Sequence, residues 1–213
     1  MPALGSSALG IYAEMGRQRA RGDPVGPDVR LVQLDEYLGV AADDPRSLFG
    51  WLRRDVASPL GVDDGRIVRL RGDATHPNAE CRSYDEAVSA AGGIDVAVLG
   101  LGPNGHLGFN EPPSPRDAPT RRVTLADESL VSNTAYWPGL EVPREALTAG
   151  MRSILAARRI LLVVTGAGKR AILHRMLADP VGPDVPASFL RELDTATLLA
   201  DRAAWPADMA APP

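Results

Sequence analysis

The sequence predicts an α/β fold with a mostly parallel sheet and helices on both of its faces. Two observations lead to this class. Apolar runs of strand length alternate with amphipathic stretches of helical spacing, which is the order of strands joined by crossover helices. Two of these runs, 94–101 and 159–165, are apolar almost throughout, as parallel strands buried on both faces require.

Each element follows from its local pattern. The run 29–34 predicts a strand that ends at Asp35, and apolar residues at helical spacing behind Pro45 predict a helix over 45–57. The same reasoning predicts further strands at 66–70, 94–101, 121–125 and 159–165. Further helices are predicted at 79–91, which ends in a glycine pair, at 144–155 behind a proline, and at 169–177. We expect a single domain over 1–205 and a loose tail over 206–213.

Composition excludes several classes of protein. The chain has 213 residues, a length that suits one domain. Its net charge of -4 and its lack of a basic tract argue against nucleic acid as a partner. No apolar run approaches the ~20 residues that span a bilayer, and the N-terminus lacks the pattern of a signal peptide. The lone cysteine, Cys81, fits a reducing cytoplasm. Without a Cys/His cluster we expect no metal site.

The segment LDEYLG, 34–39, places two adjacent carboxylates where a predicted buried strand opens into a loop. A partly desolvated carboxylate has a raised pKa, which suits it to abstract a proton. Either of the two, Asp35 or Glu36, is therefore a candidate base. The alternative interpretation is a solvated turn or a helix cap.

The segment GLGPNGHLGFNEP, 100–112, follows the buried strand 94–101 and contains His106 and Glu111 five residues apart. A carboxylate bonded to one ring nitrogen fixes the histidine tautomer and leaves the other nitrogen free for acid–base work. The alternative is that His106 caps a turn and Glu111 faces water. The glycines match a dinucleotide-binding pattern only loosely, and no clear helix follows them, so a dinucleotide site is not expected.

Two further loops resemble anion sites. Lys169 is the only lysine of the chain and lies in TGAGKR, 165–170, where a strand meets a helix N-terminus. The helix dipole disfavours a cation there, so the lysine favours a bound anion such as phosphate. Gly5, Ser6 and Ser7 also precede a helical stretch. The alternatives are an ordinary helix start at the first loop and a serine N-cap at the second.

The motifs LDEYLG, AECRSY, GLGPNGHLGFNEP, ALTAG and TGAGK, in this order, resemble the glucosamine-6-phosphate deaminase (isomerase) family, within the superfamily that includes 6-phosphogluconolactonase. The resemblance extends from about Ala3 to Trp205. It implies a Rossmann-like α/β sandwich. It also implies conversion of glucosamine 6-phosphate and water to fructose 6-phosphate and ammonia, without metal or organic cofactor.

The resemblance also implies roles for single residues. Asp35 would move the proton from C2 to C1 of the open-chain sugar. His106 would assist ring opening, Glu111 would orient His106, and Asn104 would add a hydrogen bond. The residues expected to bind the substrate phosphate are Gly5, Ser6, Ser7 and Lys169.

The chain departs from the family pattern in two places. NTAYW has Ala135 where the family carries a phosphate-binding arginine, for which Arg121 or Arg122 is the candidate replacement. The chain also begins at the serine loop. Either Met1 is a misplaced start, or the sheet lacks the family's first strand and helix and exposes an edge.

We therefore expect a cytoplasmic deaminase that acts on a small phosphosugar, with no contact to nucleic acid or membrane, and we leave a homo-oligomer open. Two alternatives remain. The first is a 6-phosphogluconolactonase-like hydrolase, although that group has a loop like GHTASLFP where this chain has GHLGFNEP. The second is a non-catalytic sugar-phosphate-binding module.

Overall fold

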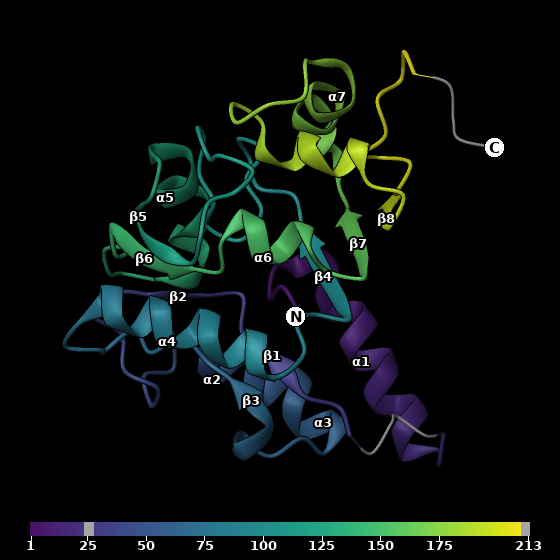
Figure 1. Cartoon of the computed structure of the whole chain (residues 1–213). Coiled ribbons are helices and arrows are strands. Elements are labelled where there is room, and N and C mark those ends of the chain that lie inside the picture. Colours follow the sequence, from purple (N-terminus) through teal and green to yellow (C-terminus); the bar gives the residue numbers. More distant parts are fainter. Residues whose placement is uncertain (24–27, 210–213) are drawn as a thin grey trace.

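A computed structural model describes residues 1–23 and 28–209 of the chain (Figure 1). It confirms the α/β class, with two parallel sheets and one antiparallel sheet. The tail predicted over 206–213 is described only as far as residue 209, and the rest of it lies outside the described residues. Within the described part, no helix is both long enough and apolar enough to cross a bilayer.

The main parallel sheet consists of β4 (Val96–Gly100), β7 (Arg159–Val164) and β8 (Ala196–Ala200), in the order β4-β7-β8. Leu99 lies opposite Leu162, and both side chains are almost fully buried. The two apolar runs therefore form neighbouring parallel strands, as predicted. Their carboxyl ends point to the same edge of the sheet, toward α7 in Figure 1, and this edge carries two of the predicted loops.

Residues 1–3 lie along the other side of β4. Pro2 forms a parallel bridge with Val98, and the N–H of Ala3 donates to the carbonyl of Val98 at 2.8 Å. A groove of about 670 Å³ is lined by Pro2, Leu31 and Val96 together with other apolar side chains. Here the described residues provide no strand that pairs β1 with residues 1–3.

A second parallel pair is formed by β1 (Leu31–Val32) and β3 (Ile67–Val68). Both strands occur within the predicted runs but are shorter than expected. Beyond β1, the backbone N–H of Gln33 still donates to the carbonyl of Val68. The chain then leaves this pair and enters the third sheet.

The third sheet is antiparallel, with the order β2-β6-β5. Its strands are β2 (Asp35–Tyr37), β5 (Arg121–Thr124) and β6 (Glu145–Thr148). The loop predicted over LDEYLG is wrong at residues 35–37, where β2 forms. Both carboxylates of that segment lie on this strand. The strand predicted at 121–125 is confirmed.

The helix predicted over 144–155 is wrong. Residues 145–148 form the central strand β6, and only α6 (Met151–Leu155) is helical. Glu, Ala and Leu favour a helix, but pairing with neighbours on both sides decides the conformation here. Gly150 separates the two elements, and a Cβ at this glycine would lie 2.2 Å from the carbonyl oxygen of Ala118.

The remaining helices cover the sheets. They are α1 (Ser6–Ala20), α2 (Leu48–Leu52), α3 (Ser58–Leu60), α4 (Pro77–Ala90), α5 (Asp127–Asn133) and α7 (Arg170–Ala178). A π-helical turn, η1 (Arg53–Ala57), joins α2 to α3 without a gap, so the predicted helix 45–57 is confirmed from residue 48, with a π-helical second half. Short 3₁₀ segments are η2 (Asp64–Arg66), η3 (Thr134–Tyr136), η4 (Ala167–Lys169) and η5 (Pro186–Glu192).

Two buried apolar clusters hold these layers together. One joins the main sheet to α4, α6 and α7 through residues such as Leu99, Leu162 and Leu173. The other packs α1, α2 and α3 against β1 and β2 through residues such as Tyr12 and Leu52. Asp35 and the loop after β4 lie where these two clusters adjoin, so the site is supported by both.

Candidate active site

The predicted loops meet around one cavity of about 280 Å³. Its wall contains residues from the N-terminal loop, from β2, from the loop after β4, from α5 and from the loop after β7. The sequence-predicted residues that line it are Gly5, Ser6, Ser7, Asp35, His106 and Lys169. Asn104 and Glu111 do not line the cavity. Both contact His106, and they also contact each other. The structure therefore brings every predicted site residue into one assembly.

Asp35 is the first residue of β2 and lies opposite Thr148 of β6. Its side chain faces the cavity although the residue is only 9% exposed. Burial, with a smaller contribution from the negative charge of Glu36, raises the pKa of Asp35 to about 7. A carboxylate with this pKa is half ionised near neutral pH and is a capable proton acceptor.

Glu36 has the opposite role, although it is the next residue. It is 1% exposed and accepts hydrogen bonds from the hydroxyl of Ser47 at 2.8 Å and from the N–H groups of Leu48 and Phe49 at 3.0 and 2.9 Å. The N–H of Tyr37 and the amide of Gln33 complete this set. Glu36 thus ties β2 to the start of α2 and is a structural carboxylate.

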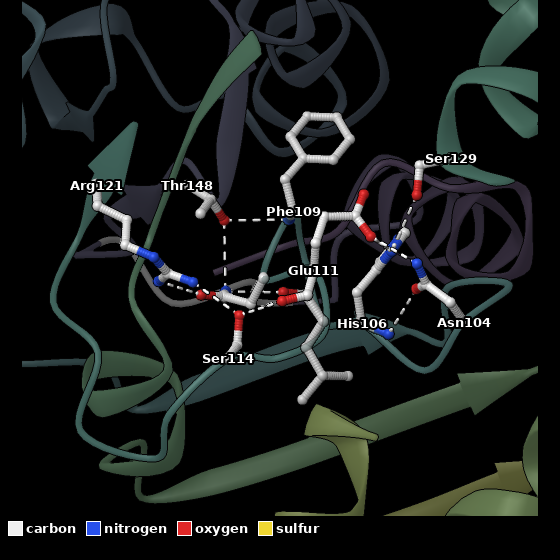
Figure 2. Close-up of polar contacts among 10 residues, drawn as sticks. Asn104, His106, Phe109, Glu111, Ser114, Arg121, Ser129 and Thr148 are labelled. Carbon is white, nitrogen blue, oxygen red and sulfur yellow. Dashed lines mark hydrogen bonds and ion pairs between the residues drawn. The ribbon is translucent and has the colours of Figure 1, made fainter. Parts of the chain in front are cut away.

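His106 is oriented by a short network in the loop after β4 (Figure 2). Its Nδ1 lies 3.1 Å from Oε2 of Glu111, and the amide of Asn104 donates to the same oxygen at 2.7 Å. The Oδ1 of Asn104 accepts from the backbone N–H of His106. A Cβ at Gly102 would lie 2.1 Å from the imidazole ring, so the glycine makes room for the histidine.

The charge of Glu111 is well defined. Burial alone would raise its pKa, but hydrogen bonds from His106, Ser129 and Asn104, with the charge of His106, lower it to about 2. Glu111 is therefore ionised and only accepts hydrogen bonds. The Nδ1 of His106 must carry a proton to face it, which leaves Nε2 as the nitrogen available for chemistry.

A second set of contacts holds the backbone of this loop. Arg121 donates to Oδ1 of Asn110 and to the hydroxyl of Ser114, both at 2.7 Å. Asn110 in turn donates to the carbonyls of Leu107 and Ala149 at 2.8 Å. Sequence reasoning did not assign Asn110 or Ser114 to the site. Their signal was the NEP segment itself, in which only Glu111 was given a role.

The other end of the cavity is suited to an anion. Gly5 is the N-cap of α1 and no side chain caps this helix, so the alternative of a serine N-cap is wrong. The hydroxyl of Ser7 contacts that of Thr165 at 2.8 Å and joins the serine loop to the lysine loop. Burial lowers the pKa of Lys169, whose ammonium has no hydrogen-bond or ion-pair partner among the described residues. Lys169 lies in η4, immediately before α7.

The expected arginine replacements do not reach this cavity. Arg121 binds the NEP segment, and Arg122 pairs with Glu145 on the exposed side of the sheet. Neither lines the cavity, and Ala135 does not line it either. Among its described lining residues, Lys169 and His106 are the only basic side chains.

An aromatic pair forms part of the remaining wall. The rings of Trp51 and Tyr136 meet edge to face with their centroids 5.1 Å apart. Sequence reasoning interpreted the tryptophans as core or surface residues, and nothing in the local pattern indicated that Trp51 would line a cavity. In the part of the chain that the structure describes, no cluster of His, Cys, Asp or Glu has the arrangement to hold a metal ion.

The fold and the site together define a class: an α/β enzyme with a buried carboxylate base, a carboxylate-oriented histidine and a cationic end in one small cavity. The comparisons agree with this class. The chain belongs to the family of glucosamine-6-phosphate isomerases/6-phosphogluconolactonase, whose profile matches residues 5–199.

Named relatives lie on the deaminase side of this family. A glucosamine-6-phosphate deaminase from Corynebacterium aurimucosum is 39% identical over 203 residues, 95% of this chain and 80% of the relative. One from Streptomyces coelicolor is 37% identical over 204 residues, 95% of this chain and 78% of the relative. A solved structure of a monomeric glucosamine-6-phosphate deaminase superposes with a TM-score of 0.91 at 33% identity, covering 96% of this chain and 85% of that one.

A 6-phosphogluconolactonase from Trypanosoma cruzi has a TM-score of 0.73 at 18% identity, with 95% of this chain and 82% of that chain covered. That likeness concerns the fold alone.

Proposed function

We propose that this chain converts glucosamine 6-phosphate and water to fructose 6-phosphate and ammonia. The observation that carries the proposal is the convergence of three groups on one cavity: the base Asp35, the oriented His106 and the unpartnered Lys169. The names of the relatives support the same reaction.

Ring opening is the first step. The cyclic sugar must lose the proton of its C1 hydroxyl and gain one on the ring oxygen. In the tautomer set by Glu111, Nε2 of His106 accepts the hydroxyl proton, and the same proton then returns to the ring oxygen. Glu111 stabilises the imidazolium that exists between these two transfers, because it is ionised and lies 3.1 Å from Nδ1.

Isomerisation and loss of ammonia follow on the open chain. Asp35 takes the proton from C2 and returns it to C1, while a proton passes from the amine nitrogen to the C1 oxygen. C1 thereby becomes a hydroxymethyl group, and the carbon–nitrogen pair at C2 becomes an imine. Water adds to this imine and ammonia leaves, which gives the ketose. One carboxylate with a pKa of about 7 serves both proton transfers, because it exists in both forms near neutral pH.

The phosphate lies, in this proposal, between the serine loop and Lys169. Ser6 and Ser7 are at the N-terminus of α1, where backbone N–H groups and the helix dipole favour an anion. Lys169 adds the positive charge from the opposite loop, and the Ser7–Thr165 contact keeps the two loops together. Asp35 and the phosphate site then bind opposite ends of one extended sugar.

The test is a product assay with the purified chain. We expect ammonia and fructose 6-phosphate in equal amounts from glucosamine 6-phosphate and none from unphosphorylated glucosamine. Absence of ammonia from both would refute the proposal. Hydrolysis of 6-phosphogluconolactone would favour the lactonase alternative, and saturable binding without turnover would favour a binding module. We further infer a cytoplasmic enzyme whose partner is the phosphosugar, without nucleic acid or membrane.

A further inference from the structure

Ser129 is buried beside the catalytic histidine, although no motif of the sequence pointed to it. It lies on α5 and is 1% exposed. Its hydroxyl oxygen is 3.3 Å from Nδ1 of His106, and Ser129 is among the groups that lower the pKa of the neighbouring Glu111. Figure 2 shows the Ser129 hydroxyl directed toward the imidazole of His106, beside Glu111.

The hydrogen atoms of this group can be assigned from the charges. Nδ1 of His106 faces both Oε2 of Glu111 and the oxygen of Ser129. Glu111 is ionised and has only lone pairs to offer, so a bare Nδ1 would oppose lone pair to lone pair at 3.1 Å. The proton therefore resides on Nδ1, and the hydroxyl hydrogen of Ser129 must point elsewhere.

A buried acceptor is available for that hydrogen. Oε1 of Glu111 is inaccessible to solvent and, within residues 1–23 and 28–209, receives no hydrogen bond that meets geometric criteria. An unsatisfied buried carboxylate oxygen costs free energy. The Ser129 hydroxyl lies beside this carboxylate, and its hydrogen is free to turn about the Cβ–Oγ bond toward it.

We propose that Ser129 is a positioning residue: its hydroxyl donates to Glu111, accepts from Nδ1–H and so, together with Glu111, holds His106 in the tautomer with Nε2 free. The importance of this tautomer for turnover rests on the proposed function. The tautomer itself does not.

The position of Ser129 also has a consequence for the cavity. The same helix continues through Ser132 and Asn133, which line the cavity, and into η3, which supplies Tyr136. The cavity wall and the His106–Glu111 pair are therefore attached to one element. Removing the Ser129 hydroxyl releases one end of that attachment while leaving the wall residues in place.

The experiment reads the tautomer directly. The chain has 3 histidines, so long-range ¹⁵N–¹H correlation spectra resolve each ring, and His106→Gln assigns the signals of His106. At pH 8.5 we expect the Nδ1–H form in the wild type. Ser129→Ala removes one of the two acceptors that face Nδ1–H. It is expected to raise the fraction of the Nε2–H form above that of the wild type, with Nδ1–H still the major form because of Glu111, and to lower kcat by up to about tenfold, a part of the 10²–10⁴ that an acid–base group contributes. KM should change less than twofold.

Three further variants make the result decisive. Ser129→Thr keeps a hydroxyl and should restore both the tautomer and kcat. Ser129→Cys has a side chain of similar volume but donates weakly, so it should show the same altered tautomer and lowered kcat that are expected of Ser129→Ala. It supplies the same test if the alanine variant does not fold. Ser89→Ala, an exposed serine on α4, is the matched control and should change nothing.

A wild-type tautomer in both Ser129→Ala and Ser129→Cys would overturn the proposal. So would an altered tautomer in Ser129→Thr that matches the alanine variant. If the wild type forms no ammonia but Ser129→Ala still alters the tautomer, the proposed function fails and the positioning role of Ser129 stands.

Discussion

Substituting Asp35 by Asn should stabilise the protein while it removes turnover. Asp35 has a pKa of about 7 in the fold against 3.8 for an ordinary aspartate. Each pH unit between these values corresponds to about 1.4 kcal/mol, so ionisation of Asp35 costs the folded state about 4 kcal/mol. Asparagine carries no charge and avoids this cost. Turnover is lost because the amide cannot accept the C2 proton.

The pH dependence has a definite sign. Below about pH 4 the carboxyl group is protonated in both the folded and the unfolded chain, so the variant gains nothing from the missing charge. Between about pH 4 and pH 7 the unfolded chain releases the proton while the folded chain retains it. The wild type therefore loses stability relative to Asp35→Asn as the pH rises through this range, and the difference is constant above it.

The assay is urea denaturation of both proteins at pH 5, 6, 7 and 8, with the difference in unfolding free energy plotted against pH. A difference of about 4 kcal/mol at pH 8 corresponds to roughly 10 °C in Tm for a chain of this size. Asp43→Asn, at an exposed position outside the cavity, is the matched control. A difference that does not grow between pH 5 and pH 8 would refute the burial of a raised-pKa carboxylate at Asp35.

Three other substitutions test the cavity and its support. Lys169→Ala should raise KM about 10- to 100-fold, with a smaller change in kcat, if the ammonium binds the phosphate equally in ground and transition states; steady-state kinetics measure it. Glu36→Gln should lower the unfolding free energy by about 2 kcal/mol, because an amide cannot accept from all the donors around this carboxylate. Leu147→Ala, at a side chain with 0% exposure in β6, should cost about 2–5 kcal/mol of stability; urea denaturation measures both.

Each of these three substitutions has a matched control at an exposed position. Arg82→Ala removes a cation away from the cavity, Glu86→Gln removes an exposed carboxylate on α4, and Leu140→Ala truncates a leucine that is 57% exposed. We expect no change in KM for the first and less than 0.5 kcal/mol for the other two. An unchanged KM in Lys169→Ala would remove the lysine from the phosphate site. Wild-type stability of Glu36→Gln or Leu147→Ala would contradict the packing described for β2 or β6.

The local sequence pattern predicted where the site lies. The runs 94–101 and 159–165 are apolar enough to identify β4 and β7, and the segments that follow them contain His106 and Lys169. Because the carboxyl ends of neighbouring parallel strands share one edge of a sheet, these segments had to meet. Two glycines of this loop have a structural reason in the fold. Gly105 has a φ of 92°, which favours glycine, and Gly102 leaves space for the imidazole of His106.

Tertiary structure decided what no local pattern contains. Residues 145–148 read as a helix, but hydrogen bonds to β2 and β5 on both sides make them a strand. Likewise, Ser129 reaches His106 across 23 positions of the chain. Such contacts depend on which elements pack together, and the residues involved have no distinctive spacing.

The two carboxylates of LDEYLG illustrate both levels. Their adjacency and their place after a buried strand are properties of the sequence, and they identified the segment as a source of acid–base chemistry. The local pattern left the two equivalent, and the family resemblance assigned the base to Asp35. The fold supplies the physical reason, because successive side chains of a strand point to opposite faces. Asp35 faces the cavity without a partner for its carboxylate among the described residues, whereas Glu36 is turned to the start of α2 and saturated with donors. Burial raises the pKa of both carboxylates, but only in Glu36 do hydrogen bonds oppose the rise. Desolvation without such bonds produces the base, and desolvation opposed by them produces the structural anchor.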